Sequence, residues 1–109
     1  MDLATDVYRL SRSWPREEAY GLTSQARRAA AAVPANIAEG YGRESTASYA
    51  QFLKIARGSL NELETHLLLA ERVGLTNPGS CADALQQVDQ LGKMLGGLIR
   101  SVKKRDVVP

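Results

Sequence analysis

A long row of apolar residues at alternating spacings of four and three constrains this fold more than any other feature of the sequence. The row lies between Ser45, a residue type that caps helix N-termini, and Gly74, a residue type that ends helices. It consists of Tyr49, Leu53, Ala56, Leu60, Leu63, Leu67 and Ala70. Heptad spacing places these side chains on one face, so we predict a helix roughly 40 Å long that packs against other helices.

Two segments that precede this helix also have helical patterns. The first covers about residues 2–13 and ends before Trp14-Pro15, because the residue before a proline disfavours helix. The second begins near Thr23, which we predict to be its N-cap. Pro34 lies inside the second segment and removes a backbone hydrogen bond, so we expect it to kink or split this helix.

The fourth segment begins near Asn77-Pro78, an N-cap residue type followed by proline at the first helical position. A second heptad-like row follows, made of Leu85, Val88, Gly92, Leu95, Ile99 and Val102. Short connections suit antiparallel neighbours. We therefore predict an all-α fold over residues 1–109. It is a single domain, an antiparallel up-down-up-down four-helix bundle with a short first helix and a second helix kinked at Pro34.

Cysteine content and apolar runs indicate where such a protein resides. The one cysteine, Cys81, has no partner for an internal disulfide, which fits a reducing compartment. The N-terminus begins Met1-Asp2-Leu3 and shows neither a basic n-region nor a long apolar h-region. No apolar run reaches the roughly 18 residues that a membrane helix needs. We expect a cytoplasmic protein with no membrane partner.

The net charge of +2 is unevenly distributed along the chain. Residues 61–92 carry one basic and five acidic side chains, a net of −4, and residues 93–109 carry five basic and one acidic, a net of +4. The basic end contains Arg100, Lys103, Lys104 and Arg105. Such an end can attract phosphate, or it can be a solvated helix terminus that complements the helix dipole. Arg27 and Arg28 are further candidate nucleic-acid contacts.

Polar residues beside the second helix form a distinctive motif, Pro34-Ala35-Asn36-Ile37-Ala38-Glu39-Gly40 followed by Gly42-Arg43. The candidate network comprises Gln25, Asn36, Glu39, Arg43 and Glu64. Glu39 and Arg43 have the i, i+4 spacing of an ion pair. We interpret the set as a partly buried structural network between the second and third helices, because buried charges must be paired. A ligand or RNA-phosphate site built from the same groups is the alternative.

The third helix carries a second apolar face opposite its seam. This face comprises Ile55, Gly58, Leu69 and Val73. A helix that is apolar nearly all round is usually buried nearly all round, so this face predicts a second copy of the chain as its partner. The alternative is a set of scattered surface residues, which are normal in soluble proteins.

The sequence offers no recognisable catalytic, cofactor or metal site. His66 has Leu63 three residues before it, so the Glu-x-x-His pair of di-iron bundles is absent. Cys81 lacks a CxxC partner, and neither a phosphate-binding GxxxxGK[ST] loop nor a GxGxxG fingerprint is present. We expect a protein that is not an enzyme.

Several long motifs occur in order and resemble one known family. They are Gly21 to Gln25, Arg27 to Ala29, Pro34 to Gly40 with Gly42-Arg43, Phe52 to Leu60, Glu62 to Thr65, Lys93 to Leu95 and Gly97 to Ser101. Together they resemble the bacterial four-helix-bundle family named for 23S rRNA intervening-sequence proteins, over about residues 7–103. Accessory variability proteins of diversity-generating retroelements form a related branch.

This resemblance implies a cytoplasmic four-helix bundle that assembles as a homopentamer. The retroelement branch binds nucleic acid, which suggests RNA as a partner here, although that branch is more basic than this chain. Family members usually have more helix before the position of Asp2. Two functions follow: a non-catalytic oligomer that binds structured RNA through basic patches, or a protein-interaction scaffold without nucleic-acid binding.

Overall fold

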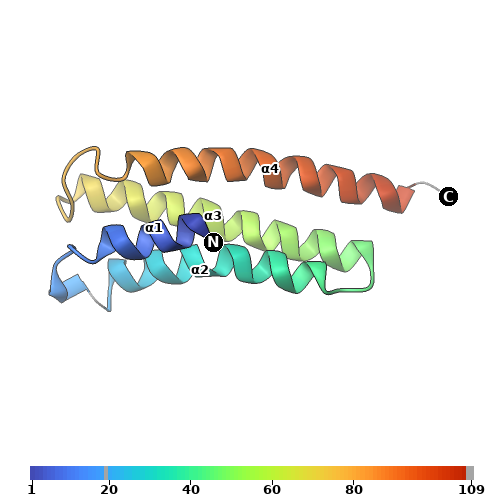
Figure 1. Ribbon diagram of the computed structural model, residues 1–109, viewed down its shortest axis with the longest axis horizontal. Coiled ribbons are helices and arrows are strands. Elements are labelled where there is room, and N and C mark those ends of the chain that lie inside the picture. Colours follow the sequence, from blue (N-terminus) through green and yellow to red (C-terminus); the bar gives the residue numbers. More distant parts are fainter. Residues whose placement is uncertain (19, 108–109) are drawn as a thin grey trace.

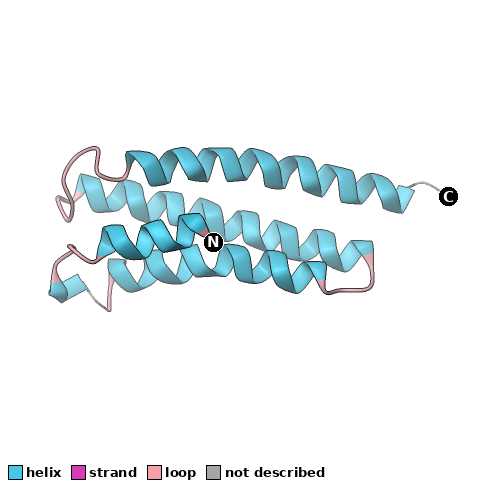
Figure 2. Ribbon diagram, viewed as in Figure 1, coloured by secondary structure: helices cyan, strands magenta, loops and turns pink. Residues whose placement is uncertain are grey.

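The computed structural model describes residues 1–18 and 20–107, and these residues form helices connected by short turns (Figure 2). The α-helices are α1 (Asp2–Ser11), α2 (Leu22–Tyr41), α3 (Thr46–Arg72) and α4 (Ala82–Val107), and a 3₁₀-helix, η1, covers Arg16–Glu18. The described residues include no strand. An all-α chain with four α-helices and a short first helix is therefore confirmed.

Helix α3 organises the molecule, which measures 54 × 22 × 19 Å. Helices α2 and α4 both pack along α3, and α1 packs against α2 and α4 (Figure 1). The α2–α3 turn and the α3–α4 connection lie at opposite ends (Figure 1). Within the described residues, the backbones of α2 and α4 do not lie close to each other. The space between these two helices is therefore the position that α1 occupies.

Helix α1 is too short to fill that position. It has 10 residues, whereas α2 has 20 and α4 has 26, and the N-terminus lies about midway along the molecule (Figure 1). We call α1 with residues 22–33, 60–72 and 82–90 of the other helices the closed half. Residues 34–41, 46–59 and 91–107 form the open half.

The predicted seam of α3 forms the centre of the core. Leu53, Leu63 and Leu67 have no exposed surface, and Tyr49 at the end of the row is half-buried. Both predicted ends of this helix are confirmed. The Ser45 hydroxyl accepts a hydrogen bond from the Ser48 amide at 3.1 Å, and Gly74 adopts a φ of 78°, a conformation that suits glycine.

The predicted N-cap of α2 and the predicted start of α4 are wrong. At each place a glutamate carboxylate accepts a hydrogen bond from a backbone amide, Glu18 from Leu22 at 3.2 Å and Glu71 from Cys81. Helix α2 begins at Leu22, close to the predicted position, but Thr23 lies inside the helix and is not its N-cap. Helix α4 begins at Ala82 and not near Asn77-Pro78. Gly79 has a φ of 83°, which is incompatible with a right-handed helix at that point.

Helix α2 continues through Pro34 as one element and is not split there. The predicted kink and the antiparallel bundle topology stay predictions. Gly40, near the end of α2, is buried, and a Cβ atom at this position would lie 2.7 Å from Cβ of Phe52 on α3. The motif Pro34 to Gly40 therefore ends on a glycine that allows α2 and α3 to approach closely.

Candidate functional site

The basic end predicted from the sequence lies on the last turns of α4 in the open half. Arg100, Lys103, Lys104 and Arg105 are all exposed. Among the side chains that the structure describes, none of the four forms an ion pair with a carboxylate. Their positive charges are therefore available to an anionic ligand.

Helix α3 adds two basic residues to this surface, Lys54 and Arg57. Lys103 lowers the pKa of Lys54, first through a side-chain hydrogen bond and then through charge repulsion, and Arg57 adds a smaller repulsion. Like charges from two helices thus meet where α3 and α4 pack together. We call Lys54, Arg57, Arg100, Lys103, Lys104 and Arg105 the basic surface.

The sequence interpretation missed Lys54 and Arg57 as members of this surface. Their i, i+3 spacing places them on one face of α3, which was visible in the sequence. Their proximity to Lys103 was not, because the register between α3 and α4 depends on the length and path of the connection between the two helices.

Arg27, a predicted nucleic-acid contact, holds α1 against α2. Its Nε atom donates a hydrogen bond to the Ser11 hydroxyl at 2.7 Å, and its guanidinium lies 5.0 Å from the centre of the Tyr8 ring. The side chain is half-buried by these contacts. Arg27 is therefore occupied inside the molecule and lies apart from the basic surface.

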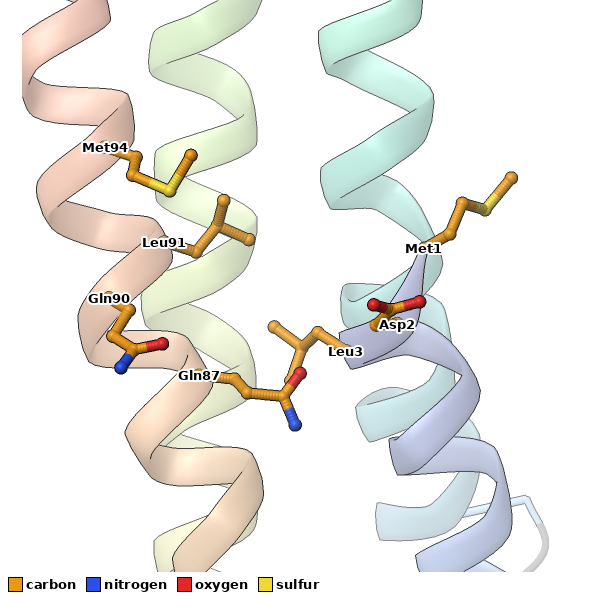
Figure 3. Close-up of a pocket in the computed structure, with 7 residues that line it drawn as sticks. All are labelled: Met1, Asp2, Leu3, Gln87, Gln90, Leu91 and Met94. Atoms are coloured by element: carbon orange, nitrogen blue, oxygen red, sulfur yellow. The ribbon is translucent and has the colours of Figure 1, made fainter.

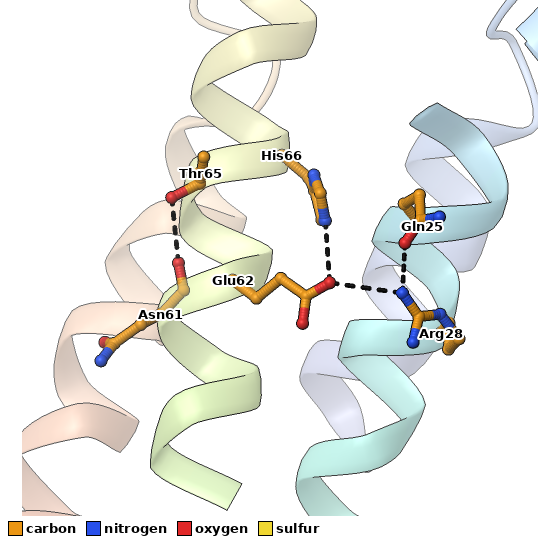
Figure 4. Close-up of polar contacts among 6 residues, drawn as sticks. All are labelled: Gln25, Arg28, Asn61, Glu62, Thr65 and His66. Carbon is orange, nitrogen blue, oxygen red and sulfur yellow. Dashed lines mark hydrogen bonds and ion pairs between the residues drawn. The ribbon is translucent and has the colours of Figure 1, made fainter. Parts of the chain in front are cut away.

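Arg28 is also engaged, in a polar group that connects α2 to α3 (Figure 4). Its guanidinium donates to the Gln25 amide oxygen and lies 3.4 Å from the Glu62 carboxylate. The same carboxylate oxygen lies 3.2 Å from His66 Nε2. Arg28 is mostly exposed, so it still presents charge to solvent, but with a carboxylate beside it.

The structure does not bring the five residues of the predicted polar network together. Asn36 donates to the Ala32 carbonyl of its own helix at 2.8 Å. The predicted ion pair between Glu39 and Arg43 is present, at 2.5 Å, and both side chains are about half exposed. Gln25 pairs with Arg28, and Glu64 is exposed on α3. Each group is satisfied locally or by solvent, so the motif does not build one buried network.

The second apolar face of α3 is exposed in the single chain. Ile55 is 42% exposed, Leu69 43% and Val73 62%. A Cβ atom at Gly58 would meet no other atom within 4 Å. Leu68, which the sequence interpretation left out, is 51% exposed and adjoins Leu69. No helix of the described chain covers these residues.

The described residues contain no group of three or more His, Cys, Asp or Glu side chains placed to hold a metal ion. Cys81 is buried, and this burial, followed by repulsion from Glu71, raises the pKa of its thiol to about 11. It is therefore a protonated thiol near neutral pH. None of the helices described is both long and apolar enough to cross a membrane.

Comparison with protein-family models gives one result that decides the family. The model described as 23S rRNA-intervening sequence protein matches residues 1–97 of the 109 in this chain. The chain belongs to this family. Comparison with curated proteins gives no match.

The family match covers only part of the basic surface. Lys54 and Arg57 lie within the matched residues, and Arg100, Lys103, Lys104 and Arg105 lie beyond them. The motif glycine Gly40 also lies within the match.

Proposed function

We propose that this protein is a non-catalytic homo-oligomer that binds structured RNA through the basic surface on α3 and α4. The observation that carries the proposal is the exposure of Arg100, Lys103, Lys104 and Arg105 on α4, none of them paired with a carboxylate among the described side chains. Lys54 and Arg57 of α3 add further positive charge beside Lys103. Holding like charges together is unfavourable by itself. Phosphate groups, which are anionic, would relieve this repulsion. The family description, which refers to 23S rRNA, supports RNA as the ligand.

The proposed binding mode depends on charge and shape more than on base reading. The basic surface contains no aromatic side chain on which an unpaired base could stack. Contacts to phosphates position a nucleic acid without reading its sequence. The expected ligand is therefore a folded RNA whose backbone phosphates lie along the basic surface on α3 and α4.

Oligomerisation is the second part of the proposal, with the subunit as an antiparallel four-helix bundle in the cytoplasm. The exposed apolar face of α3, with Ile55, Gly58, Leu69 and Val73, supports a contact between copies. The family resemblance implies five subunits. Repetition of the basic surface around a ring would allow weak contacts to add by avidity.

A protein-interaction scaffold without RNA binding is the second candidate function. The exposed apolar face of α3 favours it as well, because such a face can receive another protein as readily as a second copy. The two functions differ in their dependence on the basic surface, which a scaffold does not need.

RNA affinity measured across salt concentration tests the proposal. The wild-type protein is compared with a variant in which Arg100, Lys103, Lys104 and Arg105 are changed to Glu. A matched control changes the exposed residues Arg9, Arg12, Arg16 and Arg72 to Glu, which alters the net charge equally. Circular dichroism verifies that each variant is folded.

We expect affinity to fall steeply with salt, because bound RNA releases counterions. The α4 variant should lose affinity by at least about tenfold and show a shallower salt slope, and the control should change little. Equal losses in both variants would indicate general charge attraction. Absence of binding by folded wild-type protein at low salt would reject RNA binding and favour the scaffold.

A further inference from the structure

The motif that begins at Pro34 leads into a group of aromatic side chains at the turn between α2 and α3. Tyr41 is the last residue of α2, and Tyr49 and Phe52 lie on the first turns of α3. The rings of Tyr41 and Tyr49 meet edge to face, with centroids 6.2 Å apart and planes at 81°. The guanidinium of Arg43 lies 4.8 Å from the centre of the Phe52 ring. We call Tyr41, Arg43, Tyr49 and Phe52 the aromatic cluster.

The packing of α2 against α3 holds the aromatic cluster in position. A Cβ atom at Gly40 would lie 2.7 Å from Cβ of Phe52 and 3.1 Å from a ring carbon of Tyr49, so the glycine brings the end of α2 onto these two side chains. Both are half-buried. Arg43 is also held by its ion pair with Glu39. Groups that are fixed before binding lose little conformational entropy when a ligand arrives.

The outer part of the cluster is open to solvent. The Tyr41 residue is 78% exposed, and the Arg43 side chain is 46% exposed. An edge-to-face contact covers at most one face of the Tyr41 ring, so the other face is accessible. A tyrosine ring and a guanidinium are both flat, and both stack on flat unsaturated ligands.

The charges at the turn favour a neutral ligand over a phosphate. Residues 39–44 carry one basic side chain, Arg43, and two acidic ones, Glu39 and Glu44, a net charge of −1. This charge would repel a phosphate group. A nucleobase is flat and carries no charge, and unpaired bases stack on aromatic rings and guanidinium planes with little dependence on sequence.

The apolar area at the turn is too small to favour a protein partner. The four residues after Tyr41 are all exposed, and none of them has an apolar side chain: they are Gly42, Arg43, Glu44 and Ser45. A specific protein interface buries about 800 Å² on each partner around a continuous core. One exposed ring beside a guanidinium suits a single base.

The aromatic cluster lies at the same end of the molecule as the basic surface. Figure 1 shows the α2–α3 turn and the last turns of α4 at this end. On α3, Lys54 follows Phe52 by two residues, so the two side chains leave the helix on different sides. The molecule measures only 22 × 19 Å across its long axis. An RNA held by its phosphates on the basic surface can therefore place a neighbouring nucleotide at the turn.

Other exposed features of the molecule lack this combination. Tyr20 is 98% exposed, but among the described residues it contacts neither a second ring nor a cation, and it lies just before α2. Tyr8 is covered by Arg27 in the closed half. A hollow of about 310 Å³ lies between α1 and α4, and the side chains that line it include no aromatic ring, lysine or arginine (Figure 3).

We propose that the aromatic cluster binds an unpaired nucleobase of the RNA, stacked on Tyr41 beside Arg43. The phosphates of an adjoining double-stranded stem lie on the basic surface at the same time. This inference rests on the proposed function, and it narrows the ligand from folded RNA in general to a stem with unpaired nucleotides next to it.

Three RNAs test the proposal on the full-length protein. The first is a blunt duplex, the second is the same duplex with a single-stranded overhang of about four nucleotides, and the third has the same overhang without bases. The second and third carry the same phosphates and differ only in the groups that could stack. Fluorescence anisotropy at constant salt gives the affinities.

Three variants accompany the wild type. Tyr41→Leu removes the ring and keeps an apolar side chain, and Tyr41→Phe keeps the ring. Tyr20→Leu is the matched control, because it removes an exposed tyrosine that has no aromatic neighbour among the described residues. Circular dichroism and sedimentation verify that folding and assembly are preserved.

We expect wild type to bind the overhang with bases at least about fivefold more tightly than the overhang without bases. Tyr41→Leu should reduce this preference to less than about twofold and leave the affinity for the blunt duplex unchanged. Tyr41→Phe and Tyr20→Leu should both keep the preference.

Equal affinity of wild type for the two overhangs overturns the proposal and needs no variant. If the blunt duplex still binds in a salt-dependent way, RNA binding by the basic surface survives that result. If folded wild type binds none of the three RNAs at low salt, both proposals fail. If Tyr41→Leu dissociates an oligomer and Tyr41→Phe does not, the ring is a contact between copies, which also overturns the binding of a base.

Discussion

The closed and open halves use the same three long helices but differ in how those helices are held. In the closed half, side chains connect different helices: Arg27 contacts Ser11, Gln87 donates to the Asp6 carboxylate at 2.7 Å, and Arg28 pairs with Glu62. Near the end of the open half, Glu39 of α2 pairs with Arg43 in the turn that follows this helix, so this ion pair connects no two helices. Cations from α3 and α4 face each other there.

Burial along α4 depends on the neighbouring helix that a residue faces, since Leu95 and Ile99 of the open half are 2% and 3% exposed although α1 does not extend to them. On α4, Ala84 and Val88 are 4% and 3% exposed in the closed half. Leu91 and Leu98, which are larger and more apolar, are only half-buried in the open half. Burial here follows from the neighbouring helix and not from the hydrophobicity of the residue. The basic surface lies in the open half, whereas the exposed apolar face of α3 has residues in both halves, Ile55 in the open half and Leu69 in the closed half.

The largest expected effect contrasts one leucine from each half. Leu67→Ala removes a fully buried side chain of the closed half and should lower the free energy of unfolding by about 2–5 kcal/mol. Leu98→Ala removes a half-buried side chain of the open half and should cost about 1 kcal/mol. Urea denaturation measures both. Equal losses would mean that Leu98 is covered in solution and that the two halves do not differ in packing.

A smaller effect is expected at the close approach of α2 and α3 in the open half. Gly40→Ala would place a Cβ atom 2.7 Å from Cβ of Phe52 and should destabilise the fold by about 1–3 kcal/mol. Gly58→Ala, where no atom lies within 4 Å, is the control and should stabilise α3 by about 0.5–1 kcal/mol. Thermal denaturation distinguishes them, and a neutral Gly40→Ala would show that α2 and α3 separate easily.

Removal of the contacts that dock α1 should weaken the closed half selectively. Arg27→Ala loses the hydrogen bond to Ser11 and the contact with the Tyr8 ring, at a cost of about 1 kcal/mol. Hydrogen exchange should accelerate in α1 and remain unchanged in the seam of α3. RNA affinity should also be unchanged. A loss of RNA affinity with normal exchange in α1 would instead make Arg27 an RNA contact.

The last prediction concerns pH at the α3–α4 connection of the closed half. Hydrogen bonds from the backbone amides of Cys81 and Gly79 lower the pKa of the Glu71 carboxyl. A lowered folded-state pKa stabilises the fold fully above the ordinary glutamate pKa, 4.5, and this contribution is lost as pH falls through the folded value. Glu71→Gln should therefore be less stable than wild type at neutral pH, and the gap should narrow in acid. Urea denaturation at several pH values measures the difference in the free energy of unfolding. A difference that stays constant with pH would contradict this role of the Glu71 charge.

Much of the fold could be read from local patterns. The heptad row predicted α3, and Ser45 and Gly74 marked its ends, because capping depends on residues within a few positions of the terminus. The N-cap of α2 and the start of α4 were predicted wrongly, since Glu18 and Glu71 of neighbouring elements accept the backbone hydrogen bonds there. Residue-type rules for N-caps do not include such contacts.

The candidate sites were less predictable than the helices. The exposed positions of Arg100, Lys103, Lys104 and Arg105 agree with their pattern near the chain end. The contacts of Arg27 with Ser11 and Tyr8 could not be predicted from sequence spacing, because Ser11 lies 16 positions and Tyr8 19 positions before Arg27. Long-range proximity depends on how helices pack.

The sequence by itself determined the family, the four α-helices and the central seam, since these depend on local periodicity and on long motifs. Only the tertiary structure decided which charged residues meet and which apolar residues stay uncovered. Lys54 lies beside Lys103 because α3 and α4 pack in one register, and Leu91 and Leu98 are only half-buried because of the face of α4 on which they lie. Both features arise from contacts between distant segments, and side-chain burial depends on those contacts as much as on residue type.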